Sequence, residues 1–265
     1  MLGAIAGDMI GSVYEGGRPI SRDFSLFQSR SRFTDDTVLS VAVASAILRG
    51  KSFDASIQRW GRRYPNAGYG YLFGRWLDED NAGPYNSFGN GSAMRVAPVG
   101  WAFDSLEEVL AHAAATAEVT HSHPEGIKGA QAVAAAVFAG RSGYSKDQVL
   151  ALLSDKFGYD CSMDMPALQE RGGFDATCQG TVPVAAAAFL QSTDFEDAVR
   201  NAVSIGGDTD TLACIAGAIA EAFYGGVPAA IQAEALSRLD VALLNETSAF
   251  VNRYAVASID RTCRR

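Results

Sequence analysis

Apolar residues recur along most of this chain at the spacing expected for helices that bury one face. Six alanine-rich segments place apolar side chains at positions i, i+3, i+4 and i+7, and alanine is the strongest helix former. The segments cover residues 37–48, 106–117, 126–139, 181–190, 195–203 and 212–223. No segment shows the alternation of apolar and polar residues that is typical of a half-buried strand. The pattern therefore predicts an all-α protein.

Helix boundaries and small side chains refine this architecture. Ser105 precedes two glutamates and Asp194 precedes one, which is typical of the first turn of a helix. Gly225 and Gly226, followed by a proline, are expected to end a helix. Small residues on many helix faces allow close packing, so we expect a compact orthogonal multi-helix bundle. Residues 64–91, rich in glycine, asparagine and aromatic residues, are expected to form a long loop.

The chain shows no internal division. No linker rich in proline, glycine or serine interrupts the helical pattern, so residues 1–265 are expected to form a single domain. The chain has 22 Lys and Arg residues and 30 Asp and Glu residues, which gives a formal charge of −8. Nucleic acid attracts a basic surface, so no direct nucleic-acid binding is expected. A small ligand that carries phosphate remains compatible, because bound divalent cations can reverse the local field.

Cysteine spacing and the apolar runs bear on redox state and location. The cysteines have no C-x-x-C pair, which argues against a zinc site or a disulfide scaffold and favours reduced thiols. They are Cys161, Cys178, Cys214 and Cys263. Asp8 interrupts the apolar N-terminal run, so no signal peptide is expected. The longest apolar stretch, residues 38–48, is about half of the ~20 residues that a membrane span needs. We therefore expect a cytoplasmic protein without a membrane partner.

Two short motifs concentrate acidic and hydroxyl side chains at the start of predicted helices. One is TDDT at residues 34–37, and the other is GGDTDT at residues 206–211. Each alone could be an N-cap, in which an Asp or Thr oxygen accepts hydrogen bonds from free backbone amides. The second is not an EF-hand, because it lacks the required glycine and glutamate at the sixth and twelfth positions.

The two motifs gain meaning when they are considered together. If the helix starts converge, Asp35, Asp36, Asp208 and Asp210 could not all ionise without cations between them. Carboxylate and hydroxyl oxygens are the ligands that hard divalent cations prefer. The combination predicts a binuclear site with the two ions about 3.5–4 Å apart.

Three further segments are open to two interpretations. Asp8 and Glu15 would share one helical face, for which a solvated surface is the simpler interpretation. Residues 87–95, SFGNGSAMR, lack the third glycine and the preceding strand of a dinucleotide-binding fold. They could bind phosphates through backbone amides, with Phe88 stacked on a base, or form an ordinary turn. His121 and His123 precede a predicted helix, where a structural role is the more common one.

Together these motifs resemble the ADP-ribosylglycohydrolase family. The matching segments follow the family's order: GAIAGDMIGSVYE (3–15), TDDT (34–37), GNGSAMR (89–95), THSHPEG (120–126), TVPVAAAAFL (181–190) and GGDTDT (206–211). The resemblance implies an all-α fold and two divalent cations, Mg²⁺ or Mn²⁺. It also implies a substrate that is an ADP-ribosylated protein or a small molecule containing ADP-ribose, and we expect a monomer.

The resemblance assigns roles to individual residues. The metal ligands that it implies are Thr34, Asp35, Asp36, Asp208, Asp210 and Thr211. The residues that it places around the substrate are Glu15, Ser87, Phe88, Gly89, Gly91, Ser92, Met94, His121 and Gly207. Glu15, Asp35 and Asp36 are the candidate catalytic residues, because carboxylates can stabilise an oxocarbenium-like transition state and activate water.

The expected reaction is hydrolysis of the N- or O-glycosidic bond that joins ADP-ribose to a protein side chain or a related acceptor. The same pair of ions could support a phosphatase or a deacylase that acts on ADP-ribose 1″-phosphate or O-acetyl-ADP-ribose. A non-catalytic relative that only binds ADP-ribose is a further alternative, although the intact set of acidic residues argues against it.

Overall fold

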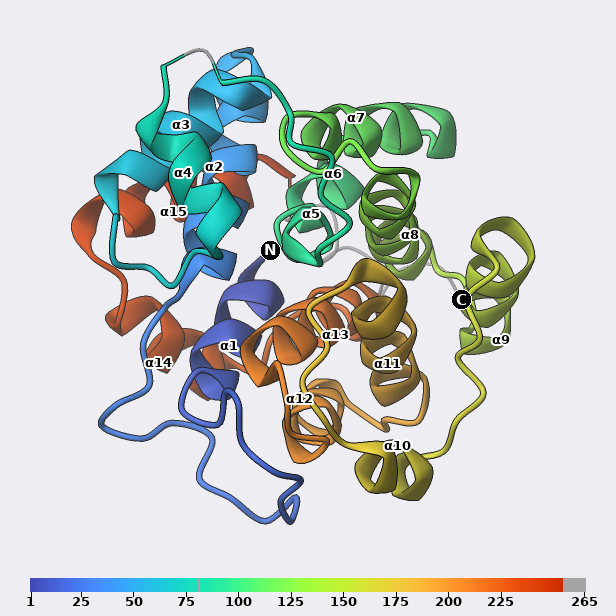
Figure 1. Cartoon of the computed structure of the whole chain (residues 1–265). Helices are drawn as coiled ribbons and strands as arrows, with labels where there is room; N and C mark the ends of the chain where they lie inside the picture. The colour runs from blue at the N-terminus through green and yellow to red at the C-terminus, as the bar shows by residue number, and fades with distance from the viewer. Residues whose placement is uncertain (81, 255–265) are drawn as a thin grey trace.

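The computed structural model describes residues 1–80 and 82–254 (Figure 1). Helices in several orientations make up nearly all of the ordered elements in this part of the chain, and no sheet is present there. Two isolated β-bridges join Gly17 to Gly207 and Gly89 to Thr177. The prediction of an all-α fold is confirmed.

The helices are defined by the following residues. They are α1 (Leu2–Gly11), α2 (Asp35–Arg49), α3 (Phe53–Arg63), α4 (Tyr71–Asp78), α5 (Gly91–Met94), α6 (Ala97–Ala102), α7 (Leu106–Glu118), α8 (Pro124–Arg141), α9 (Lys146–Ala151), the π-helical turn η1 (Leu152–Lys156), α10 (Met165–Arg171), α11 (Cys178–Leu190), α12 (Phe195–Ser204), α13 (Thr209–Tyr224), α14 (Ala229–Ser237) and α15 (Val241–Tyr254).

The predicted helices correspond to helices of the structure. The six periodic segments lie within α2, α7, α8, α11, α12 and α13. The side chains of Ser105 and Asp194 cap α7 and α12, and Gly225 ends α13 with a φ of 83°. Residues 64–91 are not entirely a loop. α4 forms within them because Phe73 and Trp76 lie one helical turn apart and are both buried.

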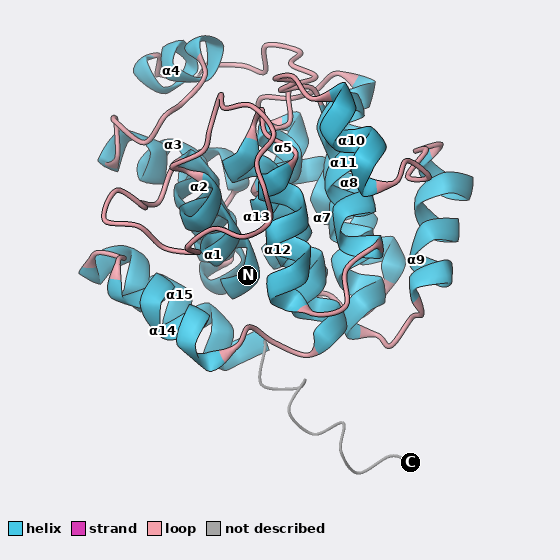
Figure 2. Ribbon diagram, turned by 90° about the horizontal axis from the view of Figure 1, so that it is seen from below, coloured by secondary structure: helices cyan, strands magenta, loops and turns pink. Residues whose placement is uncertain are grey.

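The central helix of the bundle is α13. Its residues from Thr209 to Ala222 are all buried, as expected for a helix that is surrounded by others. It packs against α1, α8, α11 and α12, and it lies in the middle of the molecule in both views (Figure 1, Figure 2).

The contact between α1 and α13 is unusually close because glycines form it. A Cβ atom added to Gly3, Gly7 or Gly11 of α1 would lie only 2.2, 2.0 or 2.3 Å, respectively, from a backbone oxygen of α13. These three glycines are four residues apart and therefore line one face of α1. The consequence is that Asp8, next to Gly7, lies against the start of α13. The expectation of a solvated face at Asp8 is wrong, because every residue of α1 is buried.

Two sequence-based expectations concern thiols and membranes. Cys161, Cys178 and Cys214 are buried free cysteines, whereas Cys263 lies outside the described residues. Among the helices of residues 1–80 and 82–254, none has the length and apolar character needed to cross a bilayer.

Candidate functional site

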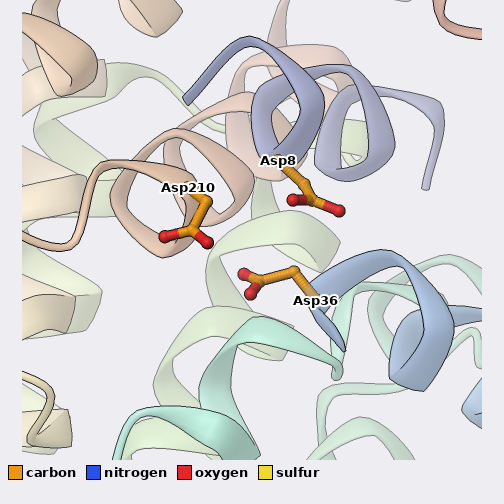
Figure 3. Close-up of side chains that lie close together, drawn as sticks. All are labelled: Asp8, Asp36 and Asp210. Atoms are coloured by element: carbon orange, nitrogen blue, oxygen red, sulfur yellow. The ribbon is translucent and has the colours of Figure 1, made fainter. Parts of the chain in front are cut away.

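Acidic residues from three helices meet at one point in the bundle. Asp8 lies near the end of α1, Asp36 in the first turn of α2 and Asp210 in the first turn of α13. One carboxylate oxygen from each lies within 4.8 Å of the others, and the three side chains point toward a common centre (Figure 3). A second group with the same spacing consists of Glu15, Asp208 and Asp210. Asp210 belongs to both groups, so the two lie side by side.

Asp8 holds the start of α2 in place. Its side chain is fully buried and accepts hydrogen bonds from the backbone amides of Thr34 at 2.9 Å and Thr37 at 3.1 Å. The hydroxyl of Thr34 donates at 2.7 Å, and the hydroxyl of Thr37 also donates to Asp8. Burial raises the pKa of Asp8 to about 6, and the hydrogen bonds oppose that shift. The sequence analysis did not assign Asp8 to the site, because a solvated helix face was the simpler interpretation there.

The TDDT motif is both a helix cap and part of the acidic cluster. Thr34 is the N-cap of α2, and its hydroxyl oxygen accepts from the Asp36 amide at 3.3 Å. Asp36 is buried, and burial, followed by the charge of Asp8, raises its pKa well above the usual value. Asp35 is half-buried, and burial, followed by the charge of Asp8, raises its pKa to about 8. Its location in the first turn leaves Asp35 on the wall of a cavity.

The GGDTDT motif forms the other half of the cluster. Gly206 and Gly207 adopt φ values of 79° and 75°, which allow the chain to turn sharply before Asp208. Burial, followed by the charge of Asp36, raises the pKa of Asp210 well above the usual value. The hydroxyl of Thr211 lies 3.3 Å from Asp36 Oδ2 and links the two helix starts. The two motifs therefore converge, as the sequence analysis required for a shared site.

A cavity of about 410 Å³ opens beside this cluster. One end is acidic, with side chains that come from the turn after α1 and from the starts of α2 and α13: Glu15, Asp35, Asp36, Asp208, Asp210 and Thr211. The other end is formed by the glycine-rich segment and its neighbours, Ser87, Gly89, Asn90, Gly91, Met94, Arg95 and His121, and the aromatic residues Tyr71, Phe73, Tyr85 and Phe174 also line the cavity. In the glycine-rich segment, Asn90 and Arg95 were not predicted from the sequence as site residues. Asn90 donates to Asp208 at 2.7 Å and so connects the two ends.

Four of the expected site residues are not among those that line the cavity. Thr34 is buried behind it, bonded to Asp8. Ser92 is fully buried, and its hydroxyl donates to the Gly126 carbonyl at 2.7 Å. Phe88 is 45% exposed, with its ring edge-on to His123. Gly207 forms the bridge to Gly17, where an added Cβ would lie 2.2 Å from the Gly173 carbonyl oxygen.

Glu15 and the two loop histidines differ in their surroundings. Glu15 is exposed and lies beyond the end of α1, so it does not share a helical face with Asp8. Desolvation and the charge of Asp208 raise its pKa. His121 is buried at the cavity wall, and burial, followed by the charge of Arg95, lowers its pKa well below the usual value. His123 is the N-cap of α8 and accepts from the Glu125 amide, which is a structural role.

Comparisons with known proteins agree with this arrangement. A family model described as ADP-ribosylglycohydrolase matches residues 1–259. ADP-ribosylhydrolase ARH3 of Mus musculus is 27% identical over 305 residues, which cover 85% of this chain and 82% of the relative. ADP-ribosylarginine hydrolase Tri1 of Pseudomonas putida is 26% identical over 268 residues, with coverages of 86% and 71%.

A solved structure supports the same assignment. The chain aligns with an ADP-ribosylglycohydrolase-related protein complex with a TM-score of 0.70 and 26% identity, over 95% of this chain and 96% of the other. The sequence motifs, the helical fold and the acidic cavity are all consistent with the family model, which covers nearly the whole sequence. The chain therefore belongs to the ADP-ribosylglycohydrolase family and is a hydrolase of glycosidic bonds.

Proposed function

We propose that this protein uses two divalent cations, Mg²⁺ or Mn²⁺, to hydrolyse the glycosidic bond between ADP-ribose and a protein side chain or a related acceptor. The observation that carries the proposal is the cavity with two unlike ends. Five carboxylates line one end, and the rest of the wall combines glycine backbone, a serine and a buried histidine with several aromatic side chains. Such a cavity suits a ligand that has sugar hydroxyls near cations and phosphates near hydrogen-bond donors.

The carboxylates at the acidic end are better satisfied by bound cations than by protonation alone. Asp36 Oδ1 is buried and has no hydrogen-bonding partner among the described residues. A buried carboxylate oxygen without a donor is costly, and a divalent cation would satisfy it. The proposed ligands are Asp35, Asp36, Asp208, Asp210 and Thr211, with Thr34. Asp8 orients the start of α2 through four hydrogen bonds.

The reaction requires a water molecule that attacks the ribose carbon as the bond to the acceptor breaks. Bound cations would orient the ribose hydroxyls and lower the pKa of a water. Asp35 is the candidate to take the proton from that water. It lines the cavity and is less buried than Asp36, so that it could contact both a cation and the attacking water. Glu15, exposed at the rim, is the candidate to hold the substrate near the scissile bond.

The glycine-rich end is proposed to bind the ADP part. Ser87, Gly89, Gly91 and Met94 line this wall, with His121 behind the glycines. Phe88 is exposed and lies between Ser87 and Gly89, which line the cavity, so its ring is the candidate to stack on a base. Relatives named for ADP-ribosyl hydrolysis and for ADP-ribosylarginine hydrolysis support an ADP-ribosylated substrate without fixing the linkage.

The decisive experiment measures released ADP-ribose from arginine-, serine- and poly-linked substrates with added Mg²⁺, Mn²⁺ or chelator. We expect Asp36→Asn and Asp210→Asn to lower the rate by at least about 100-fold on the preferred linkage. Asp23→Asn, at an exposed acid outside the cavity, is the matched control. An unchanged rate in chelator, together with active Asp36 and Asp210 variants, would refute the metal mechanism. With ADP-ribose 1″-phosphate or O-acetyl-ADP-ribose as the substrate, release of inorganic phosphate or acetate in place of hydrolysis of the protein linkages would identify the alternative phosphatase or deacylase.

A further inference from the structure

Arg95 is a fully buried cation at the cavity wall. Its Nη2 donates to the Thr116 carbonyl at 2.7 Å and to the Thr120 hydroxyl at 2.9 Å. Nε and Nη1 find no acceptor, and no carboxylate pairs with the guanidinium within the part of the chain that the structure describes. Burial lowers the pKa of Arg95 only to about 10, so it stays charged at neutral pH. A buried charge without a counter-ion is costly, and an anion in the adjoining cavity would compensate for it.

Thr120 lies between Arg95 and His121. A guanidinium can only donate, so the Thr120 oxygen must accept from Arg95. The hydroxyl hydrogen is then free to donate, and His121 Nδ1 lies 2.7 Å from the same oxygen. If Nδ1 carried the proton instead, the Thr120 hydrogen would have to turn toward the Tyr85 hydroxyl, which interacts with Thr120 but makes no hydrogen bond with it as close as the 2.7 Å contact to His121. The contacts therefore favour an unprotonated Nδ1 and a protonated Nε2.

The second ring nitrogen of His121 faces the glycine-rich wall of the cavity. A Cβ added to Gly91 would lie 2.9 Å from Nε2, and one added to Gly89 would lie 3.5 Å from it. Both glycines line the cavity, and their lack of side chains leaves Nε2 accessible from it. Burial and the Arg95 charge lower the pKa of His121, so the ring is neutral and its tautomer decides what Nε2 can do.

We propose that Arg95 and Thr120 are positioning residues that hold His121 in the Nε2–H tautomer, so that His121 donates a hydrogen bond to an anionic phosphate oxygen of the ligand. The tautomer follows from contacts within the protein alone. The identity of the ligand as a diphosphate rests on the proposed function. Arg95, whose buried guanidinium adjoins the cavity, is assigned a positioning role. Arg95 acts through its hydrogen bond to Thr120 and through its buried positive charge, which favours an anion in the cavity.

The tautomer can be measured directly by NMR, because the chain has three histidines. Long-range ¹H–¹⁵N spectra of protein labelled with ¹⁵N-histidine at pH 7, assigned with His121→Gln, should show the proton of His121 on Nε2. Thr120→Ser keeps the hydroxyl and should preserve this signature, whereas Thr120→Val should move part or all of the proton to Nδ1. Thr116→Val is the matched control, because the hydroxyl of Thr116 is also buried but bonds only to its own helix, at Ala113.

The binding measurement then tests the role toward the ligand. ADP-ribose should shift the His121 Nε2 resonance of the wild type, and Thr120→Val should raise the dissociation constant at least 5-fold while Thr116→Val leaves it unchanged. An Nδ1–H tautomer in the wild type would overturn the positioning network. An Nε2–H tautomer that stays the same in Thr120→Val would overturn it as well. If the Nε2–H tautomer is found but ADP-ribose does not bind, the proposed function and the phosphate contact fail and the network remains.

Discussion

Asn90 donates a hydrogen bond of 2.7 Å to Asp208, and this contact joins the glycine-rich wall of the cavity to its acidic end. The same nitrogen donates to the Thr181 hydroxyl at 3.0 Å, so both hydrogens of the amide are used. Asp208 is therefore held in a fixed orientation by a residue that lies 118 positions earlier in the chain. An oriented carboxylate is what a tight cation site requires.

Replacing Asn90 with leucine should weaken cation binding more than it weakens the fold. The change keeps a similar volume but removes both hydrogen bonds, which frees the Asp208 carboxylate to rotate. We expect the Mn²⁺ concentration at half-maximal activity to rise about 10-fold or more. Activity titrations with Mn²⁺ measure this, with the exposed Asn245→Leu as control. An unaltered Mn²⁺ titration would show that Asn90 does not orient a ligand.

Asp8→Asn should destabilise the protein when cations are bound. Oδ2 of Asp8 accepts three of the four hydrogen bonds and Oδ1 accepts one, so the amide nitrogen of Asn would face at least one of these donors, and each unsatisfied buried group costs about 1–3 kcal/mol. We expect the free energy of unfolding in urea at saturating Mn²⁺ to fall by about 3 kcal/mol. In chelator the loss should be smaller, because the neutral side chain also removes repulsion with Asp36. Equal losses in both conditions would contradict a cation between these groups.

The stability of the metal-free protein should fall as the pH rises. Folding raises the pKa of Asp8 from 3.8 to about 6 and that of Asp35 from 3.8 to about 8, and it raises those of Asp36 and Asp210. Folded molecules thus hold protons that unfolded chains have released, and the stabilisation, fully present below pH 3.8, is lost as the pH rises through 6 and 8.

We therefore expect the Tm in chelator to decrease between pH 5.5 and pH 8.5. Mg²⁺ or Mn²⁺ should diminish this decrease, because cations replace the protons in compensating for the clustered carboxylates. Thermal melts across this range, with and without metal, test the expectation. A Tm in chelator that is constant or increases with pH would contradict it.

Gly7→Ala should separate two helices that support the site. The new methyl group would lie 2.0 Å from the Ala213 carbonyl oxygen, so α1 must move away from α13. We expect a loss of about 1–3 kcal/mol in urea unfolding and a lower activity, because Asp8 moves with α1. Gly74→Ala in α4 is the control, since nothing lies within 4 Å of its added methyl group. That variant should be neutral or more stable by about 0.5–1 kcal/mol. Equal effects of the two substitutions would argue against a tight α1–α13 contact.

Much of the fold could be predicted because periodicity and capping are local properties. Ser105, Asp194 and Gly225 end or begin helices where the sequence indicated. The convergence of the TDDT and GGDTDT motifs could be inferred because their carboxylates need a shared partner. Asp8 could not be recognised in the same way, since a single acid on a helix carries no local sign of burial. Its burial depends on glycines that allow α1 to meet a helix about two hundred residues away.

Asn90 and Arg95 were missed for a related reason. Both belong to a segment in which glycines and hydroxyls drew attention to phosphate binding, and a lone amide or guanidinium has many possible roles. Asn90 is part of the site because it hydrogen-bonds to Asp208, and Arg95 because it hydrogen-bonds to Thr120. Neither contact corresponds to a residue spacing that can be recognised in the sequence.

The tight packing of α1 against α13 has a consequence for the order in which the protein is synthesised. The Thr209 hydroxyl bonds to the Gly11 carbonyl across 198 positions of sequence. A ribosome that adds about 5–20 residues per second needs about 10–40 s to cover that interval. For that time α1 has been made, but the helix on which it packs has not. Until α13 has been made, the glycine face of α1 lacks the helix that buries it in the folded protein.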